Sequence, residues 1–225
     1  MKTVFYTADV SALADERLFQ AAYRAVPPER QAKADRLRLP EDKRLSLGAA
    51  LLLRHALSKA GITGEPRFAV RGEGKPCLDG EAGVFFNLSH SGTVAACAVS
   101  PYEIGCDVEK IGGGGLPLAR RFFHPAEVER LAAAAPEEQQ LLFCRLWTLK
   151  ESFVKATAEG LRLPLSSFEI RFSEDGVLPV SEDGHDYFFR ELTDVPGCCA
   201  ALCTRDGDAG AEHRTVDLAA LPEMR

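Results

Sequence analysis

The order of predicted elements repeats in the two halves of the chain, and this repeat is the strongest constraint on its fold. Each half runs from a strand through several helices to further strands, over roughly 105 to 120 residues. The order therefore predicts an α+β fold with two similar lobes related by a pseudo-twofold, each with helices packed on a small, mainly antiparallel sheet. We place the lobes at residues 1–104 and 105–225 and expect a functional site between them.

The individual elements are short strands and amphipathic helices separated by proline and glycine. The predicted strands cover residues 4–7, 67–71, 84–88, 94–100, 103–109, 168–172, 187–192 and 197–203. The predicted helices cover residues 11–23, a segment from 29, then 41–60, 117–121, 126–135 and 137–159.

The helix predicted over residues 137–159 has three different faces. One face is an apolar stripe, and a second is expected to meet solvent because it carries Arg145, Thr148, Ser152 and Glu159. The third carries Trp147 beside Lys150, Glu151 and Lys155. These charges are either helix-spaced ion pairs on a solvated surface or groups that point at a highly charged ligand. We interpret Trp147 as a packing residue.

A pair of carboxylates lies on the predicted strand 103–109. Asp107 and Glu109 are two residues apart and therefore share one face of the strand. The pair indicates either an exposed strand edge or a site for Mg²⁺, which prefers oxygen ligands.

Three further polar segments are candidates for anion binding. Asn87 to Gly92 follows a strand and is rich in hydroxyl, amide and imidazole groups, although such a segment is also typical of an ordinary turn. Gly72 to Pro76 resembles a turn. Arg30, Lys33 and Arg44 form either a phosphate-binding patch or an ordinary solvated helix surface.

Composition narrows the class of protein. The 225 residues are 46% hydrophobic and 27% charged with a net charge of −6, which argues against nonspecific nucleic-acid binding. With no long apolar run and no signal-peptide pattern, we expect a cytoplasmic protein that does not enter a membrane. The seven cysteines are expected to be reduced thiols, mostly buried, and not zinc ligands.

Five motifs, taken in order, resemble the 4'-phosphopantetheinyl transferase superfamily, in particular its larger, monomeric, Sfp-like type. They are Gly74-Lys75-Pro76, Asn87 to Gly92, Gly105 to Lys110, Phe122 to Glu127, and Trp147 to Lys155. The resemblance implies Mg²⁺-dependent transfer (Mn²⁺ is possible) of 4'-phosphopantetheine from coenzyme A to a serine of an apo acyl or peptidyl carrier protein, releasing 3',5'-ADP. Such carriers serve fatty-acid, polyketide or nonribosomal peptide synthesis.

The resemblance also implies roles for single residues. Asp107, Glu109 and Glu151 are implied metal ligands. Glu151 is the candidate base, Lys155 is expected to touch phosphate, and Lys150 and Glu127 are expected to assist catalysis, although Glu127 also suits the first turn of a helix. The expected coenzyme A contacts are Arg30, Lys33, Arg44, Lys75, Pro76, Ser89, His90 and Lys155. For carrier docking we expect Arg120, Arg121, Leu116, Leu118 and Phe122.

Two other functions are alternatives to the transferase. A coenzyme A-binding module without catalysis would need the basic groups but neither the carboxylates nor Lys155. A Mg²⁺-dependent hydrolase of pyrophosphate esters would use the same charges to activate water.

Overall fold

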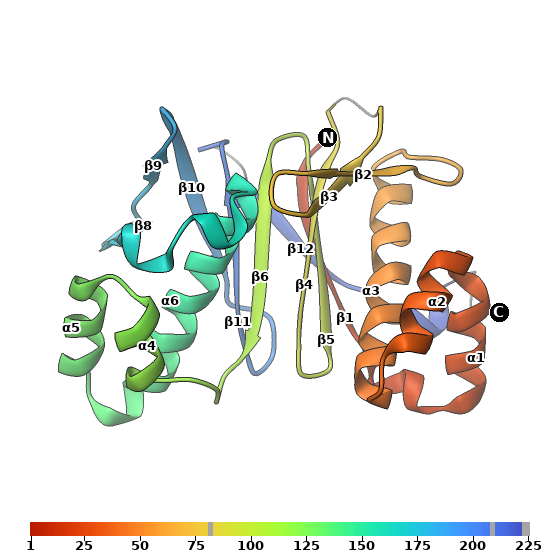
Figure 1. Ribbon diagram of the computed structural model, residues 1–225, viewed down its shortest axis with the longest axis horizontal. Coiled ribbons are helices and arrows are strands. Elements are labelled where there is room, and N and C mark those ends of the chain that lie inside the picture. Colours follow the sequence, from red (N-terminus) through yellow and green to blue (C-terminus); the bar gives the residue numbers. More distant parts are fainter. Residues whose placement is uncertain (81–82, 208–209, 222–225) are drawn as a thin grey trace.

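The computed structural model describes residues 1–80, 83–207 and 210–221, and it consists of two units in which a long helix covers a sheet (Figure 1). The strands gather at the middle of the molecule, and helices flank them on both sides. This arrangement confirms the predicted α+β class with two similar lobes.

The first unit contains a four-stranded sheet in the order β12-β1-β5-β4. Its strands are β1 (Thr3–Asp9), β4 (Phe85–Ser91), β5 (Val94–Ser100) and β12 (Ala211–Thr215). Helix α3 (Pro40–Lys59) buries leucines against this sheet, and α1 (Glu16–Ala25) and α2 (Pro28–Arg36) lie outside it. A separate hairpin is formed by β2 (Phe68–Arg71) and β3 (Lys75–Leu78).

The second unit has an antiparallel sheet in the order β6-β11-β10-β9. Its strands are β6 (Ile104–Lys110), β9 (Val180–Glu182), β10 (His185–Leu192) and β11 (Cys198–Thr204). Helix α6 (Pro136–Thr157) covers β6 and β11, with α4 (Leu116–Phe122) and α5 (Pro125–Ala133) beside it. Strands β7 (Phe172–Ser173) and β8 (Gly176–Val177) pair with each other.

Polar side chains join the two sheets where β4 meets β6. Asn87, Ser89 and Ser91 are alternate residues of β4 and therefore share one face. Their side-chain oxygens accept hydrogen bonds from alternate backbone N–H groups of β6, which belong to Cys106 (2.9 Å), Val108 (3.4 Å) and Lys110 (3.0 Å). The segment Asn87–Ser91 is thus a strand and not the predicted loop, and it fixes β6 against the first lobe.

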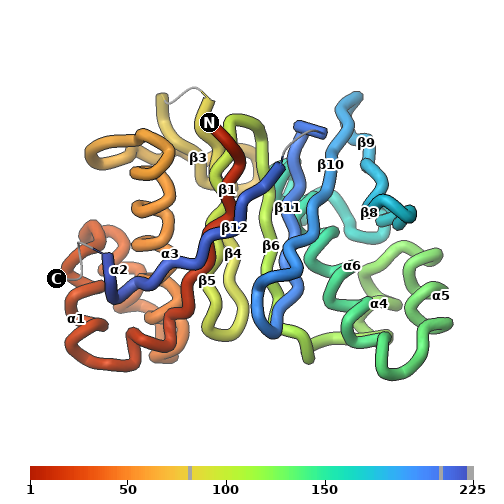
Figure 2. The backbone as a smooth tube through the Cα atoms, turned by 180° about the vertical axis from the view of Figure 1, so that it is seen from behind, coloured from red at the N-terminus to blue at the C-terminus, as the bar shows by residue number. Residues whose placement is uncertain are grey.

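The last strand does not belong to the lobe in which the sequence placed it. Strand β12 pairs in parallel with β1, and Leu218 and Leu221 beyond it pack into the core of the first lobe. Figure 2, which views the molecule from behind, shows this segment crossing the near side beside β1. Residues 211–215 therefore pair with the first sheet, although the sequence assigned them to the second lobe, and the boundary between residues 104 and 105 stays a prediction.

A second correction concerns the strand predicted over residues 168–172. Phe168 to Arg171 is irregular, because two of its backbone groups bind side chains and not a neighbouring strand. The Ile170 N–H donates to Glu127 at 2.7 Å, and the Phe168 carbonyl accepts from Lys150 at 2.7 Å. Backbone groups satisfied in this way need no sheet ladder.

The faces of α6 also differ in part from the prediction. Leu146, Leu149 and Phe153 are fully buried, as the apolar stripe predicts. Thr148 and Ser152, expected in solvent, are 1% and 0% exposed, and their hydroxyls bond to carbonyls of their own helix. The reason is the close approach of β6, since a Cβ on Gly105 would lie 2.0 Å from the Ser152 carbonyl oxygen.

Two expectations from composition can be compared with the structure. All seven cysteines are free thiols, and five of them are buried, as predicted. Among the described residues, no helix has both the length and the apolar character needed to span a membrane.

Candidate active site

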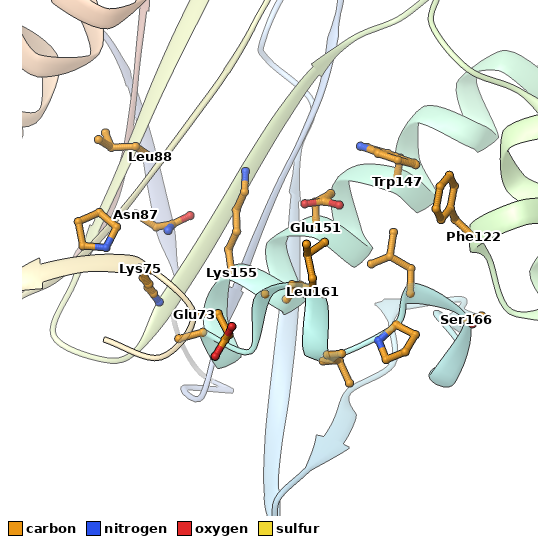
Figure 3. Close-up of a pocket in the computed structure, with 18 of the residues that line it drawn as sticks. Glu73, Lys75, Asn87, Leu88, Phe122, Trp147, Glu151, Lys155, Leu161 and Ser166 are labelled. Carbon is orange, nitrogen blue, oxygen red and sulfur yellow. The ribbon is translucent and has the colours of Figure 1, made fainter. Parts of the chain in front are cut away.

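A cleft between the two lobes contains most of the residues that the sequence singled out. It consists of two adjoining cavities of about 770 and 600 Å³. Both are lined by Leu88 from β4 and by Trp147, Glu151 and Lys155 from α6, and Figure 3 shows these side chains along the larger cavity. The expected site between lobes therefore corresponds to a real cavity.

Strand β6 supplies two carboxylates to the smaller cavity. Asp107 and Glu109 face α6, and each is held by a serine of β4. The Ser89 hydroxyl donates to Asp107 Oδ1 at 2.7 Å, and the Ser91 hydroxyl donates to Glu109 Oε2 at 2.7 Å. The same serines accept from the β6 backbone, so they fix both the strand and its carboxylates.

Helix α6 supplies a lysine and a third carboxylate. Lys155 Nζ lies 2.6 Å from Asp107 Oδ1 and 3.1 Å from the Ser89 hydroxyl. Burial acts to lower the pKa of Lys155, but the neighbouring acidic groups, with Asp107 foremost, together outweigh burial and the pKa is raised. Glu151 stands one turn earlier on the same face. Burial and the neighbouring charge of Asp107 raise its pKa.

The three carboxylates can be tested as ligands for a divalent cation. Among the described residues, no group of three or more His, Cys, Asp or Glu side chains converges closely enough to hold a metal, and Lys155 is the cation nearest to Asp107. The donor set nevertheless fits Mg²⁺. Asp107 Oδ2 is buried and has no hydrogen-bond partner among these residues, and repulsion from Asp107 contributes to the raised pKa of Glu109 and Glu151.

The smaller cavity also has a basic wall, which consists of Arg30 and Lys33 from α2 and His90 from β4. Asp42 of α3 lines the same cavity. Burial lowers the pKa of Arg30. The structure brings these basic groups to one cavity, and their contact with an anion stays a prediction.

Sequence reasoning missed Ser46 on this wall. Its hydroxyl is buried, lines the smaller cavity and has no hydrogen-bond partner among the described residues. A single serine inside the apolar pattern of α3 gives no signal in the sequence. Because a buried polar group without a partner is costly, Ser46 is a good candidate for a ligand contact.

Two of the basic residues predicted to contact coenzyme A, Arg44 and Lys75, have other partners within the protein. Arg44 lines a separate cavity of about 220 Å³ near α1 and pairs with Glu41 at 3.3 Å. Lys75 and Pro76 both line the larger cavity, but the Lys75 ammonium donates to the Ile104 carbonyl at 2.8 Å. We therefore exclude the Arg44 side chain from the cleft.

Lys150 and Glu127, predicted as catalytic, are both completely buried and line neither cavity. Lys150 Nζ lies 2.8 Å from Glu127 Oε1 and also donates to the Phe168 carbonyl. Glu127 accepts from the backbone of Ile170 and of His124, which completes a capping box at the start of α5. This geometry corrects the prediction, because neither side chain reaches the cleft.

Aromatic packing explains the place of Trp147. Its ring contacts those of Phe122, Phe123 and Phe143, with centroids 6.4, 6.1 and 5.8 Å away. It is the packing residue that the sequence predicts, and its remaining surface lines the cleft. Phe122 and Arg121 from α4 form the rim of the larger cavity.

Comparison with known proteins identifies the family. A family model described as the 4'-phosphopantetheinyl transferase superfamily matches residues 103–203. The chain is 34% identical to a 4'-phosphopantetheinyl transferase of Bacillus subtilis over 98% of this chain and 92% of that protein. It is 35% identical to the 4'-phosphopantetheinyl transferase Sfp of Bacillus subtilis strain 168 over 81% of this chain and 84% of the relative. A third relative, the 4'-phosphopantetheinyl transferase psf-1 of Bacillus pumilus, is 35% identical over 82% of this chain and 81% of that protein. The chain belongs to the 4'-phosphopantetheinyl transferase superfamily.

Proposed function

We propose that the interlobe cleft transfers 4'-phosphopantetheine from coenzyme A to the serine hydroxyl of an apo carrier protein, with release of 3',5'-ADP. One observation carries the proposal. A basic wall formed by Arg30, Lys33 and His90 lines the same cavity as Lys155 and three carboxylates. The 3'-phosphate of coenzyme A suits the basic wall, and the pyrophosphate, which contains the reacting phosphorus, suits Lys155 and the carboxylates.

The basic wall would hold the nucleotide end of coenzyme A. Arg30 and Lys33 provide charge for the 3'-phosphate, and the free Ser46 hydroxyl provides a neutral donor beside them. His90 is exposed and lines the same cavity as the β6 carboxylates, and we assign it to the pyrophosphate. Ser89 is engaged with Asp107, so it would act by orienting the metal-binding wall.

The α6 wall would carry out the chemistry. Lys155 would move from Asp107 toward a phosphate oxygen and offset the negative charge that grows as the pyrophosphate bond breaks. Glu151 is the candidate base for the serine proton, because burial and nearby carboxylates raise its pKa toward the range of a useful proton acceptor. The proton would leave with Glu151 as the serine oxygen attacks the β-phosphorus.

Asp107, Glu109 and Glu151 would hold Mg²⁺, or Mn²⁺, which supplies charge neutralisation to the pyrophosphate when bound. The serine hydrogen bonds to Asp107 and Glu109 keep two of these carboxylates turned toward the cleft. In this account the chain needs no second copy, because both walls come from one chain; we propose a cytoplasmic monomer.

The carrier would approach at the rim of the larger cavity. Arg120 and Arg121 are exposed on α4, where they suit an acidic helix of a carrier, and Phe122, Leu116 and Leu118 provide adjacent apolar surface. The Arg121 guanidinium lies 5.1 Å from the Phe122 ring centroid, which keeps both side chains at the mouth of the cavity.

The test is incubation of the protein with coenzyme A, Mg²⁺ and apo carriers of fatty-acid, polyketide and peptide synthesis, followed by intact-mass measurement. We expect one added phosphopantetheine on at least one carrier and none on its Ser→Ala variant. Release of 3',5'-ADP without a carrier adduct would indicate the hydrolase instead. Coenzyme A binding with neither product would indicate a binding module.

A further inference from the structure

The C-terminal end of α6 is held in an unusual way. The helix ends at Thr157, and the next residue, Ala158, is in the left-handed region with φ 61°. That position usually belongs to glycine, because a side chain there strains the backbone. The last carbonyls of a helix also lack partners within the helix. Another part of the chain must therefore stabilise this end.

The first lobe provides that contact through the turn between β2 and β3. The Glu73 N–H donates to the Ala158 carbonyl at 3.0 Å, and Lys75 Nζ donates to the Ala156 carbonyl at 3.4 Å. A Cβ on Gly72 would lie 2.2 Å from the Ala158 oxygen, so the turn is seated against the helix end. Figure 3 shows Glu73 and Lys75 beside the end of the helix that carries Lys155.

Lys75 is the centre of this contact. Its ammonium donates to the carbonyls of Ile104 and Ala156 and lies 3.8 Å from Glu103 Oε2. An ammonium has three N–H donors, of which two are used by backbone carbonyls, and the Glu103 carboxylate lies at ion-pair distance. Burial lowers the pKa of Lys75 to about 8, which leaves it mainly charged at neutral pH, and a positive charge is favourable at a helix C-terminus.

The two carbonyls lie next to the catalytic wall. Ile104 precedes Gly105, where β6 lies in close contact with α6, and Ala156 follows Lys155. One ammonium thus bridges the strand that carries Asp107 and the helix that carries Lys155.

We propose that Lys75 is a positioning residue that fixes α6 against β6, so that Lys155 and Glu151 stand correctly opposite Asp107, and that its side chain is not a coenzyme A contact. The inference rests on the proposed function only for the catalytic roles of those three residues. The cap itself is independent of that function. The neighbouring Pro76 lines the larger cavity.

The test compares Lys75→Met and Lys75→Arg with a matched control, Glu73→Ala, which removes an exposed ion pair with Arg162 but keeps the capping N–H. Three quantities are measured for each: amide hydrogen exchange in residues 154–158, the Kd of coenzyme A by calorimetry, and kcat and KM for transfer. If Lys75→Met does not fold, Lys75→Gln, which keeps a neutral donor, is measured in its place.

For Lys75→Met we expect exchange in residues 154–158 to rise by about tenfold while exchange in α3 stays unchanged. We expect kcat to fall roughly 10- to 100-fold through misplacement of α6. The Kd of coenzyme A should stay within about threefold. Lys75→Arg should recover most of the kcat, and Glu73→Ala should resemble the parent protein.

A rise in Kd above about tenfold, with exchange and kcat unchanged, would show a direct ligand contact and overturn the proposal. The test of Lys75 can fail or succeed independently of the proposed transferase function. If the parent protein transfers nothing to any carrier, the exchange measurement alone still decides whether Lys75 holds the end of α6.

Discussion

Helix α6 carries two lysines five residues apart, and each pairs with a carboxylate at short distance in a different environment. Lys155 lies 2.6 Å from Asp107, and its side chain is 28% exposed to the cleft. Lys150 lies 2.8 Å from Glu127, and both side chains are 0% exposed. The first pair can exchange partners with a ligand, whereas the second cannot do so without unfolding. We therefore assign the first pair to chemistry and the second to stability.

The partners of the two carboxylates show the same difference. Asp107 keeps one buried oxygen without a hydrogen-bond partner among the described residues, which suits a group that must bind something else. Glu127 uses both oxygens on Lys150 and on the backbone of Ile170 and His124. A satisfied buried network rigidifies a fold, and an unsatisfied group in a cleft marks a binding position.

The largest effect is expected for Glu151→Gln in the cleft. The variant loses a base and a candidate metal ligand, and we expect transfer to fall by at least about 10³-fold. Because burial and the repulsion from Asp107 and Glu109 disfavour the Glu151 charge, thermal stability should stay equal or rise. Intact-mass rates and thermal unfolding measure both quantities, with the exposed Glu138→Gln of the same helix as control. Retained activity would contradict the assignment of this wall to chemistry.

The next effect concerns Glu127→Gln in the buried pair. The substitution keeps the shape but leaves the Lys150 charge uncompensated, which is expected to reduce the free energy of unfolding by about 3–5 kcal/mol. Transfer per folded molecule should change little. Denaturant unfolding and normalised rates test this, with the exposed Glu129→Gln of α5 as control. A stable protein with lost transfer would move Glu127 back into the catalytic group.

A smaller effect is expected for Ser91→Ala, which removes the hydroxyl that orients Glu109. Partners of this kind typically change metal affinity by about tenfold or more, so we expect a roughly tenfold rise in the Mg²⁺ concentration needed for half-maximal transfer. Ser181→Ala, which removes an exposed hydrogen bond to Asp186, is the control. An unchanged Mg²⁺ requirement would show that the serines of β4 serve only to join the sheets.

The smallest effect is expected for Arg44→Ala. Arg44 lies in a separate cavity and pairs with an exposed glutamate, so the KM of coenzyme A should change by less than about twofold. Lys33→Ala, which removes a charge from the cleft itself, should raise that KM roughly tenfold. Equal effects of the two substitutions would place Arg44 in the binding site.

The sequence predicted the parts of the site that depend on spacing along one element. Asp107 with Glu109, and Glu151 with Lys155, follow from the two-residue repeat of a strand and the four-residue repeat of a helix. The burial of Lys150 does not follow, because helical spacing does not say which neighbour covers a polar face. Gly105 lets β6 cover the face that carries Thr148 and Ser152. Lys150 is buried by different partners, Glu127 of α5 and the Phe168 carbonyl.

Features formed by residues far apart in sequence were the ones missed. The pairing of β12 with β1 joins the two ends of the chain, and nothing local in residues 211–215 indicates it. The free hydroxyl of Ser46 and the Lys75 contact to Ile104 and Ala156 likewise depend on how lobes and helices meet. Periodicity predicts which side of an element is apolar, but not which partner covers it.

Two similar lysine pairs on one helix have different roles, one in chemistry and one in stability, and one paired measurement tests this difference. Lys155→Met and Lys150→Met are compared for transfer rate per folded molecule and for the midpoint of thermal unfolding. We expect Lys155→Met to lose about 10²–10³-fold in rate, with a smaller fall in midpoint than Lys150→Met because the position of the Lys155 ammonium is open to water from the cleft. We expect Lys150→Met to lose stability while it keeps most of its rate. The reverse pattern, with rate lost at Lys150 and stability lost at Lys155, would contradict the account.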